Sequence, residues 1–199
     1  MPNNFINNST FKNRTIEETE NFVLIPSVSP ITIGHIMILP KYHVKSMAQI
    51  NPKDIKELIS FFTDVTNKLK SKLGNYIFFE HGVGKSKQGG CGVDHAHLHL
   101  LPIQENYFNS IIEKITPDFP LTKEMDLSNF IINASHLDSY LMIGNSSSSE
   151  ILFSQNNNIP SQYLRKNIAT ITKSNSSDWK QLFGWGEFKN TLELFSKKQ

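Results

Sequence analysis

The sequence predicts an α+β fold, with an antiparallel sheet and packed helices in the first half of the chain. Four short runs rich in aromatic and β-branched residues are typical of strands. One long amphipathic stretch lies between the second run and the third. The order strand–strand–helix–strand–strand, with short connections, favours an antiparallel α+β unit over residues 20–103.

Proline, asparagine and glycine residues indicate where the first two strands and the long helix begin or end. Strands are expected at residues 22–25 and 32–39, and each is stopped by a proline. Asn51 and Pro52 open the helix as N-cap and first helical residue. Apolar residues at three- and four-residue spacing continue it as one stripe until Gly74. The remaining elements are expected at residues 76–79 (strand), 80–92 (glycine-rich loop), 93–101 (strand) and 109–115 (helix).

The chain is expected to divide into three parts. A polar arm covers residues 1–19, a first domain covers residues 20–116, and an extension of residues 117–199 packs on or beside that domain. The composition shifts toward serine and asparagine in the extension, and no internal repeat is evident. Within the extension we expect a hairpin of residues 139–144 and 150–154 and helices at residues 161–170 and 187–196.

The composition argues against several classes of protein. The 199 residues carry a net charge of +2, which disfavours binding to nucleic acid or to an anionic membrane surface. The single cysteine, Cys91, excludes a disulfide framework and an all-cysteine metal site. We find neither a signal peptide nor an apolar run near the roughly 20 residues of a membrane span. We therefore expect a cytoplasmic protein that does not enter a membrane.

Three of the seven histidines, His95, His97 and His99, alternate along one expected strand. Alternation places them on one face, about 6.5–7 Å apart, with apolar residues on the other face. Solvated histidines gathered by chance are one interpretation. A metal site is a second interpretation, with further ligands to come from His43, His81, Cys91 and Asp94. Nucleophilic catalysis is the third, because neutral imidazole attacks phosphorus readily.

Two neighbouring segments favour the catalytic interpretation. Residues 34–43 read Gly-His-Ile-Met-Ile-Leu-Pro-Lys-Tyr-His, and residues 89–94 carry glycines directly into the histidine strand. Together with His-Ala-His-Leu-His-Leu-Leu at residues 95–101, these segments resemble the histidine-triad (HIT) superfamily over about half the chain. The resemblance implies a HIT-like antiparallel sheet of about five strands with two helices, followed here by a hairpin-and-helix extension.

The resemblance also implies roles for four histidines. His97 would be the nucleophile, attacking the α-phosphorus of a nucleotide-like phosphoanhydride or phosphoramidate and forming a covalent phosphohistidine. His99 would bind a phosphate oxygen and assist the leaving group. His95 would orient His97. His35, on the neighbouring strand, would stabilise the hydrogen-bond network of the triad.

Departures from the family pattern fall in the expected nucleoside pocket. Ser27 stands where many members bind ribose hydroxyls, and Glu80 stands where many have an asparagine. Cys91 and Gly92 replace the glutamine or serine that typical hydrolases carry before the triad. The phosphorus chemistry is expected to survive these changes, and His99 in the third triad position favours the hydrolase branches.

Further substrate contacts are expected around the histidines. His81 lies in the expected loop at the mouth of the pocket, and Gly90 would offer a backbone N–H to an anion. Gln162 and Arg165 share a helix face, and Arg165 would contact a substrate phosphate. An ordinary place on the surface of the extension is an equal alternative for Arg165. The expected substrate contacts are Ser27, His81, Gly90, Cys91, Gly92, Gln162 and Arg165.

The sequence therefore predicts a histidine-triad hydrolase that acts on a small nucleotide or phosphate-ester-like substrate and needs no cofactor or metal. Two alternatives stay open: a nucleotidyltransferase or phosphorylase of the same superfamily, and a non-catalytic interaction module that holds zinc. Short family members pair as homodimers through their sheets, and whether this chain does so depends on what residues 120–199 cover.

Overall fold

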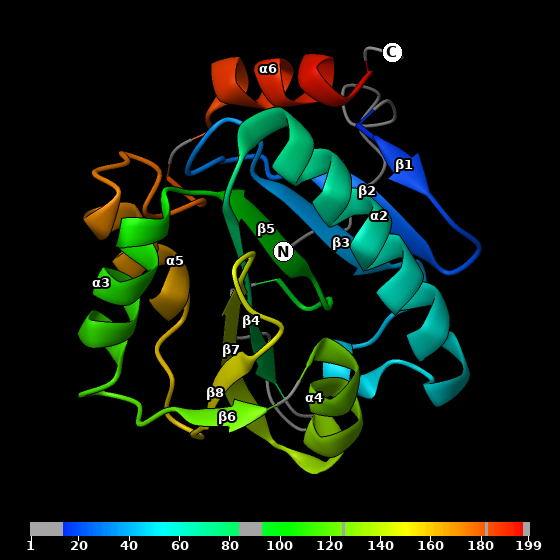
Figure 1. Cartoon of the computed structure of the whole chain (residues 1–199), viewed down its shortest axis with the longest axis vertical. Coiled ribbons are helices and arrows are strands. Elements are labelled where there is room, and N and C mark those ends of the chain that lie inside the picture. Colours follow the sequence, from blue (N-terminus) through cyan, green and yellow to red (C-terminus); the bar gives the residue numbers. More distant parts are fainter. Residues whose placement is uncertain (1–13, 84–92, 125, 182, 197–199) are drawn as a thin grey trace.

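One antiparallel sheet of eight strands runs through the described part of the chain, and it continues across the boundary expected near residue 116 (Figure 1). The computed structural model describes residues 14–83, 93–124, 126–181 and 183–196. The strand order is β1-β2-β3-β5-β4-β7-β8-β6, and every neighbouring pair is antiparallel. The strands are β1 (Glu17–Glu18), β2 (Phe22–Pro26), β3 (Ile36–Pro40), β4 (Tyr76–Val83), β5 (Leu98–Pro102), β6 (Thr122–Glu124), β7 (Ser139–Asn145) and β8 (Ile151–Gln155).

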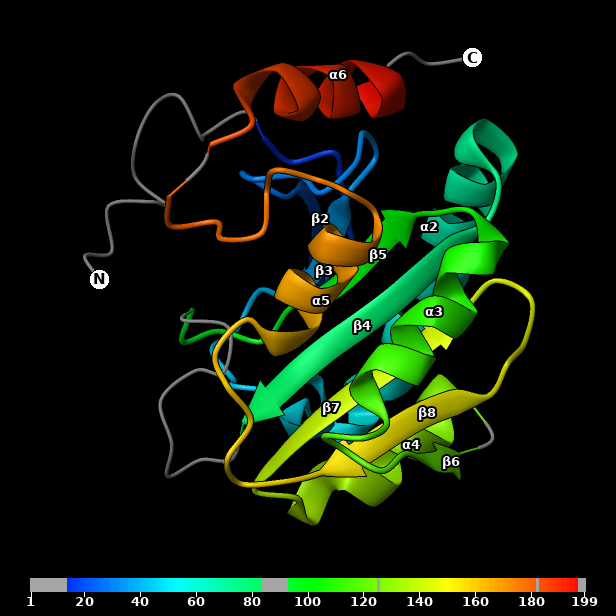
Figure 2. The same ribbon diagram turned by 90° about the vertical axis from the view of Figure 1, so that its left-hand side faces the viewer.

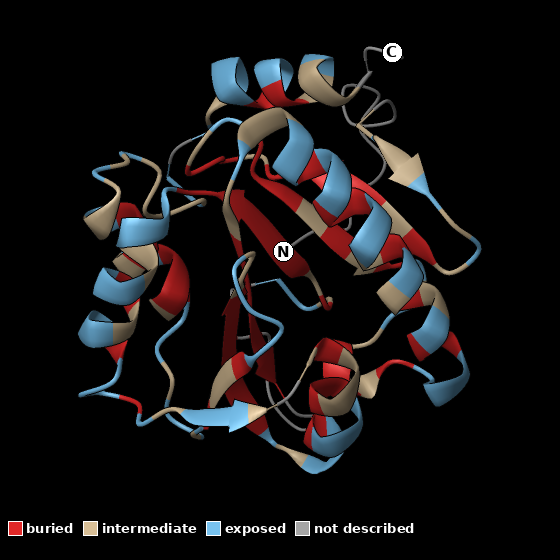
Figure 3. Ribbon diagram, viewed as in Figure 1, coloured by how far each residue is buried: buried red, intermediate tan, exposed pale blue. Residues whose placement is uncertain are grey.

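Helices cover both faces of this sheet. Helices α2 (Ile55–Leu73) and α4 (Leu127–Asn133) pack on one face, and α3 (Glu105–Ile115) and α5 (Tyr163–Ile171) pack side by side on the other (Figure 2). Helix α6 (Trp185–Ser196) lies at the β2 side of the molecule. The buried residues follow this layering, since the inner strands β2, β3, β5, β4 and β7 are largely buried, while the edge strands β1 and β6 and the outer sides of the helices are exposed or half-buried (Figure 3). The α+β class is confirmed.

The long helix forms where its cap and apolar stripe predict it. The Asn51 side chain accepts a hydrogen bond from the Lys53 N–H, and a short 3-10 turn, Pro52–Asp54, leads into α2. Leu58 and Leu69 of the stripe are fully buried against the sheet, and Ile59 and Phe62 are partly buried. Gly74 ends the helix with a positive φ of 80°.

The second strand begins later than expected. Residues 32–35 form a turn, and β3 starts only at Ile36. Gly34 has a φ of +88°, and a β-carbon built there would lie 2.2 Å from the Leu73 side chain. The Gly34 N–H donates to the Thr191 hydroxyl of α6 instead of to a strand. Side chains of α2, β5 and α6 therefore pack closely around Gly34, and the chain joins the sheet only after His35.

The third strand is longer than expected. Residues 80–83, predicted as the start of a glycine-rich loop, belong to β4. They stay in the sheet because β7 pairs with β4 from Ile77 opposite Asn145 to Val83 opposite Ser139. β4 is therefore an internal strand, and a homodimer that joins sheet edges would have to use β1 or β6.

The histidine strand is shorter than expected at its start. β5 begins at Leu98, so the predicted strand over residues 93–97 is wrong. The register of β3 against β5 would bring Ala96 opposite Pro40, which has no N–H for the ladder. The Ala96 N–H donates instead to the Val44 carbonyl at 2.7 Å. His95 and His97 consequently lie in the segment that enters the strand.

The extension contains the predicted hairpin, as β7 and β8, and the predicted helices, as α5 and α6. Its first elements, β6 and α4, were not predicted. β6 is short and largely exposed, so it has no apolar alternation. α4 has only two turns, and the Asp126 side chain caps it by accepting from the Asn129 N–H. In the part of the chain described here, no helix is long and apolar enough to cross a membrane.

Candidate active site

Four histidines from three parts of the sheet lie together on the face that α5 covers. His35 immediately precedes β3, His97 immediately precedes β5, His99 lies on β5, and His81 lies on β4. The His97 and His99 rings are 4.8 Å apart and nearly perpendicular, and the His35 and His99 rings are 5.1 Å apart. Neighbouring backbone segments therefore bring together imidazoles that are far apart in the sequence.

Hydrogen bonds fix the tautomers of His35 and His99. The Ile31 backbone N–H donates to His35 Nδ1 at 3.2 Å, so the proton of neutral His35 is on Nε2. That proton is donated to His99 Nδ1, with 2.9 Å between the nitrogens. Because His99 Nδ1 accepts, the proton of neutral His99 is on Nε2. His99 thus has an N–H available for an anionic oxygen.

The tautomer of His97 is the opposite one. His97 Nδ1 lies 2.8 Å from the His95 carbonyl oxygen, which can only accept, so His97 carries its proton on Nδ1. His97 Nε2 then keeps its lone pair. His95 is held in turn, because its Nε2–H donates to the Pro40 carbonyl at 2.8 Å. The arrangement leaves an unprotonated nitrogen on His97 beside an N–H donor on His99.

The surroundings keep these rings neutral near pH 7. Burial is the largest cause that lowers the pKa of His97 below its ordinary 6.5, and the nearby charges of His95 and Arg165 lower it further. Burial also lowers the pKa of His99 and of His35 well below that value, with Arg165 acting in the same direction. The Phe79 ring stacks on His99 at 4.5 Å and contributes to this apolar setting. Phe79 has no polar atom and was not singled out from the sequence.

His81 is the fourth imidazole of the cluster. Phe79 on β4 pairs with His99 on β5, and this register brings His81 toward His97. His81 is only 6% exposed, and its Nδ1 has no hydrogen-bond partner among the described residues. Burial first, and then His97, lower the pKa of His81 to about 4. A buried polar atom without a protein partner suits contact with a ligand.

Glu80 lies on the opposite face of β4 from the histidines, although the family pattern placed it at a pocket position. It accepts hydrogen bonds from the Tyr140 hydroxyl and from the Met47 N–H. Burial raises its pKa to about 7. Glu80 is therefore part of the packing between the first half of the chain and β7.

Gln162 and Arg165 hold the extension together beside the histidines. Arg165 is buried, and its Nη2 donates to the Ser29 carbonyl, the Ser29 hydroxyl and the Ser176 carbonyl. The Gln162 side chain donates to Asp178 and accepts from the Trp179 N–H. Arg165 thus ties α5 to the loop that precedes His35, while its charge acts on the histidines.

The other expected contacts are placed differently. Ser27 is 3% exposed, and its N–H donates to the His35 carbonyl, so it supports the turn before β3. Gly90, Cys91 and Gly92 lie outside the described residues. Among the described residues, no group of three or more His, Cys, Asp or Glu side chains is arranged to hold a metal ion.

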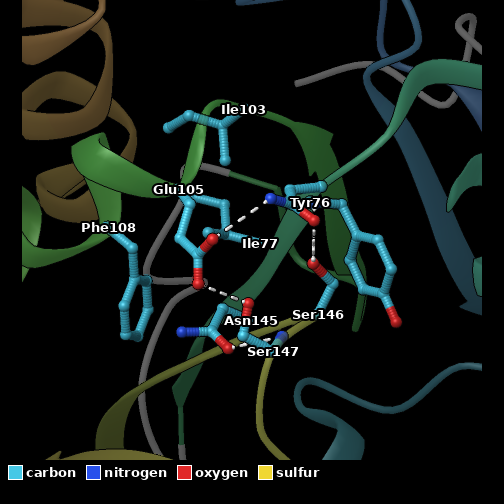
Figure 4. A pocket seen from close by; sticks show the side chains of 9 residues that line it. Tyr76, Ile77, Ile103, Glu105, Phe108, Asn145, Ser146 and Ser147 are labelled. Atoms are coloured by element: carbon cyan, nitrogen blue, oxygen red, sulfur yellow. Dashed lines mark hydrogen bonds between the residues drawn. The ribbon is translucent and has the colours of Figure 1, made fainter.

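A small cavity lies away from the histidines, at the start of β4. Its volume is about 10 Å³, and it is lined by Tyr76, Glu105 and Ser147 among others (Figure 4). Glu105 accepts from the Ser147 hydroxyl across it. A space of that size holds about one water molecule, so it is not a substrate site.

Comparison with known proteins matches the first half of the chain to a family. The family model for the HIT domain matches residues 8–106. An uncharacterized HIT-like protein of Helicobacter pylori is 30% identical over 86 residues, which cover 43% of this chain and 80% of that protein. The chain belongs to the HIT family. The four clustered histidines all lie within the matched residues.

Other HIT proteins match the same half of the chain. The mouse adenosine 5'-monophosphoramidase HINT3 is 26% identical over 94 residues, covering 47% of this chain and 56% of the mouse protein. An uncharacterized HIT-like protein of Borreliella burgdorferi is 26% identical over 81 residues, which span 58% of its own length. A solved histidine triad nucleotide-binding protein from Sulfolobus tokodaii is 24% identical, with a TM-score of 0.41, covering 51% of this chain and 67% of that one.

Proposed function

We propose that this protein is a HIT hydrolase that cleaves a nucleotide-like phosphoanhydride or phosphoramidate through a covalent phosphohistidine on His97. The observation that carries the proposal is the pair of opposite tautomers, with a lone pair on His97 Nε2 beside an N–H on His99. The HIT relative from mouse, named as an adenosine 5'-monophosphoramidase, supports the substrate class.

The first step forms a bond between His97 Nε2 and the α-phosphorus and breaks the bond from phosphorus to the leaving group. The leaving group departs with the electron pair of that bond: a phosphate departs as its anion, and an amine takes up a proton from solvent as it departs. The His97 ring becomes a phosphorylated imidazolium, and its Nδ1–H continues to donate to the His95 carbonyl. The His99 N–H donates to a phosphate oxygen and stabilises the charge that develops there.

The second step returns the enzyme to its starting state. Water attacks the phosphorus, the N–P bond breaks, and its electron pair returns to His97 Nε2. One proton of the water leaves to solvent as the nucleoside monophosphate forms. The division of one displacement into two easier ones is the advantage of the covalent route.

The direct test is intact-mass analysis of the full chain mixed with nucleoside phosphoramidates and dinucleoside polyphosphates. We expect a transient gain of one nucleoside monophosphoryl group that maps to His97 and is lost in acid. Absence of both adduct and turnover across the panel, or an adduct on another residue, would contradict the proposal. Product analysis separates hydrolysis from transfer, since a transferase releases the nucleotide only when an acceptor such as phosphate is added.

The pH dependence of turnover provides a second test. His97 attacks only as the neutral ring, so activity should fall on the acid side as His97 becomes protonated. Because burial lowers the pKa of His97, we expect the acid limb of kcat/KM to have its midpoint below 6.5. The measurement is a pH profile with a substrate that does not itself ionise in that range. A midpoint above 6.5 would contradict this assignment.

His81 is proposed as a substrate contact. In the variant H81L, a buried hydrogen bond to the substrate would be lost, so KM should rise by roughly tenfold while kcat stays within a few-fold. The exposed His136 offers a matched control, and H136L should leave both constants unchanged. A fall in kcat with KM unchanged would show that His81 does not act through substrate binding.

A further inference from the structure

The order of elements in the extension repeats the order in the first half. β3-α2-β4-β5-α3 and β6-α4-β7-β8-α5 are both strand–helix–strand–strand–helix. In the sheet, β3-β5-β4 is followed by β7-β8-β6. If β6, β8 and β7 correspond to β3, β5 and β4, the second set of strands has the same order as the first, read in the opposite direction. We call residues 36–115 the first unit and residues 122–171 the second unit. The repeat is not evident in the amino-acid sequence.

The contact between the units is symmetric at the level of single residues. Where β4 and β7 pair, Gly82 lies opposite Tyr140 and Phe78 lies opposite Gly144. A β-carbon built on Gly82 would lie 2.2 Å from the Tyr140 ring, and one built on Gly144 would lie 2.2 Å from the Phe78 ring. Each strand thus has an aromatic residue followed four positions later by a glycine, and each ring covers the other strand's glycine.

This exchange defines a local two-fold axis through the pair Glu80 and Met142. The same axis also relates the helices of the two units. α2 packs beside α4 on one face, and α3 packs beside α5 on the other (Figures 1 and 2). An axis perpendicular to the sheet produces this arrangement, because it exchanges the units and keeps each face on its own side.

The axis also identifies the residues of the second unit that correspond to the histidines of the first. It relates Phe79 to Leu141, and these residues pair with His99 and Ser154 respectively. Two residues further along each strand, His81 corresponds to Ile143, which pairs with Leu152. Leu141 and Ile143 are buried with Ile111 and Ile115 of α3. The histidine positions of the second unit are therefore filled by Ile143, Leu152 and Ser154, so packed side chains without an imidazole occupy the place of a second site.

We propose that residues 122–171 are a degenerate internal copy of residues 36–115, paired with it through β4 and β7 about the local two-fold axis. The protein is then a monomer built as a two-fold pair, with one histidine site in the first unit and a packed core in the second. The second unit contributes α5, whose Arg165 reaches Ser29 beside the histidines. This proposal does not depend on the reaction proposed above.

The first test is the solution mass of the full chain, measured by sedimentation or light scattering across a wide range of concentrations. We expect 22.7 kDa throughout. A dimer that forms as concentration rises, or that persists on dilution, would overturn the statement that the protein is a monomer, because the two-fold pair would then not be complete within one chain.

The second test examines the reciprocal ring-on-glycine contacts by two double-mutant cycles. G144A and G82A should each lower Tm by several degrees, since a methyl group meets the opposite ring. F78L should relieve part of the G144A loss, and Y140L should relieve part of the G82A loss. G186A is the matched control, because nothing lies within 4 Å of a β-carbon there, and it should not lower Tm. Independent, additive effects in either cycle would overturn the symmetric contact. Neither test uses activity, so failure here is distinct from failure of the proposed reaction.

Discussion

Replacing His97 by alanine is expected to abolish turnover and the covalent adduct, with kcat/KM falling by roughly 10³- to 10⁶-fold. The loss follows from removing the atom that forms the bond to phosphorus. His97 does not hold the sheet together, since its side-chain hydrogen bond within the described residues is to the His95 carbonyl two residues away. The thermal unfolding midpoint of H97A should therefore stay close to that of the wild type.

Two controls separate chemistry from folding in this experiment. The variant H136A changes an exposed histidine and should keep full activity. The variant H97G leaves a space for free imidazole, which should restore part of the turnover if a neutral imidazole is the nucleophile. Full activity in H97A, or an equal stimulation of H136A and H97G by free imidazole, would contradict the assignment of His97.

Replacing Glu80 by alanine is expected to lower the free energy of unfolding by about 2–5 kcal/mol. The Tyr140 hydroxyl and the Met47 N–H both donate to Glu80, and both would be left buried without an acceptor. The loss should appear in denaturant unfolding followed by circular dichroism. E80Q retains an acceptor and the side-chain volume, so it should be distinctly less destabilised than E80A. Equal losses in the two variants would exclude hydrogen bonding as the cause.

The same carboxyl group should make stability depend on pH. Burial raises the pKa of Glu80 from 4.5 to about 7, so the folded state favours the protonated form. Its contribution to stability is full below pH 4.5 and is lost as the pH rises to 7. At about 1.4 kcal/mol for each pKa unit, the change is on the order of 3 kcal/mol. The difference between wild type and E80Q isolates it from the histidines, and a difference that is constant between these pH values would contradict the assignment.

Much of the first half could be predicted from local signals. The cap at Asn51 and the apolar stripe of α2 locate that helix, because both signals depend only on neighbouring residues. The hairpin of β7 and β8 was found because serines separate two apolar runs. The sequence motifs also selected His35, His97 and His99, whose rings lie together in the structure.

Features set by distant contacts could not be predicted. β4 continues through Glu80 and His81 because β7 pairs with it, and β5 begins late because extending its register against β3 would place Ala96 opposite Pro40. The two-fold relation rests on Gly144 meeting Phe78, and a lone glycine gives no such signal. The tautomer of His35 depends on the Ile31 N–H, a backbone group that has no signature in a sequence.

The Gly34 hydrogen bond to Thr191 bears on how much of the protein can be separated from the rest. The residue before His35 is tied to the last helix, 157 positions away in the chain. Cutting the chain after the region that matches the HIT domain would remove Thr191, Arg165 and β7, the strand that pairs with the outer side of β4. Such a fragment would contain every histidine of the triad yet expose an unpaired apolar strand edge, which favours aggregation. The half of this chain that carries the histidines therefore depends on contacts from the later elements, and moving it into another scaffold would require those elements to be moved with it.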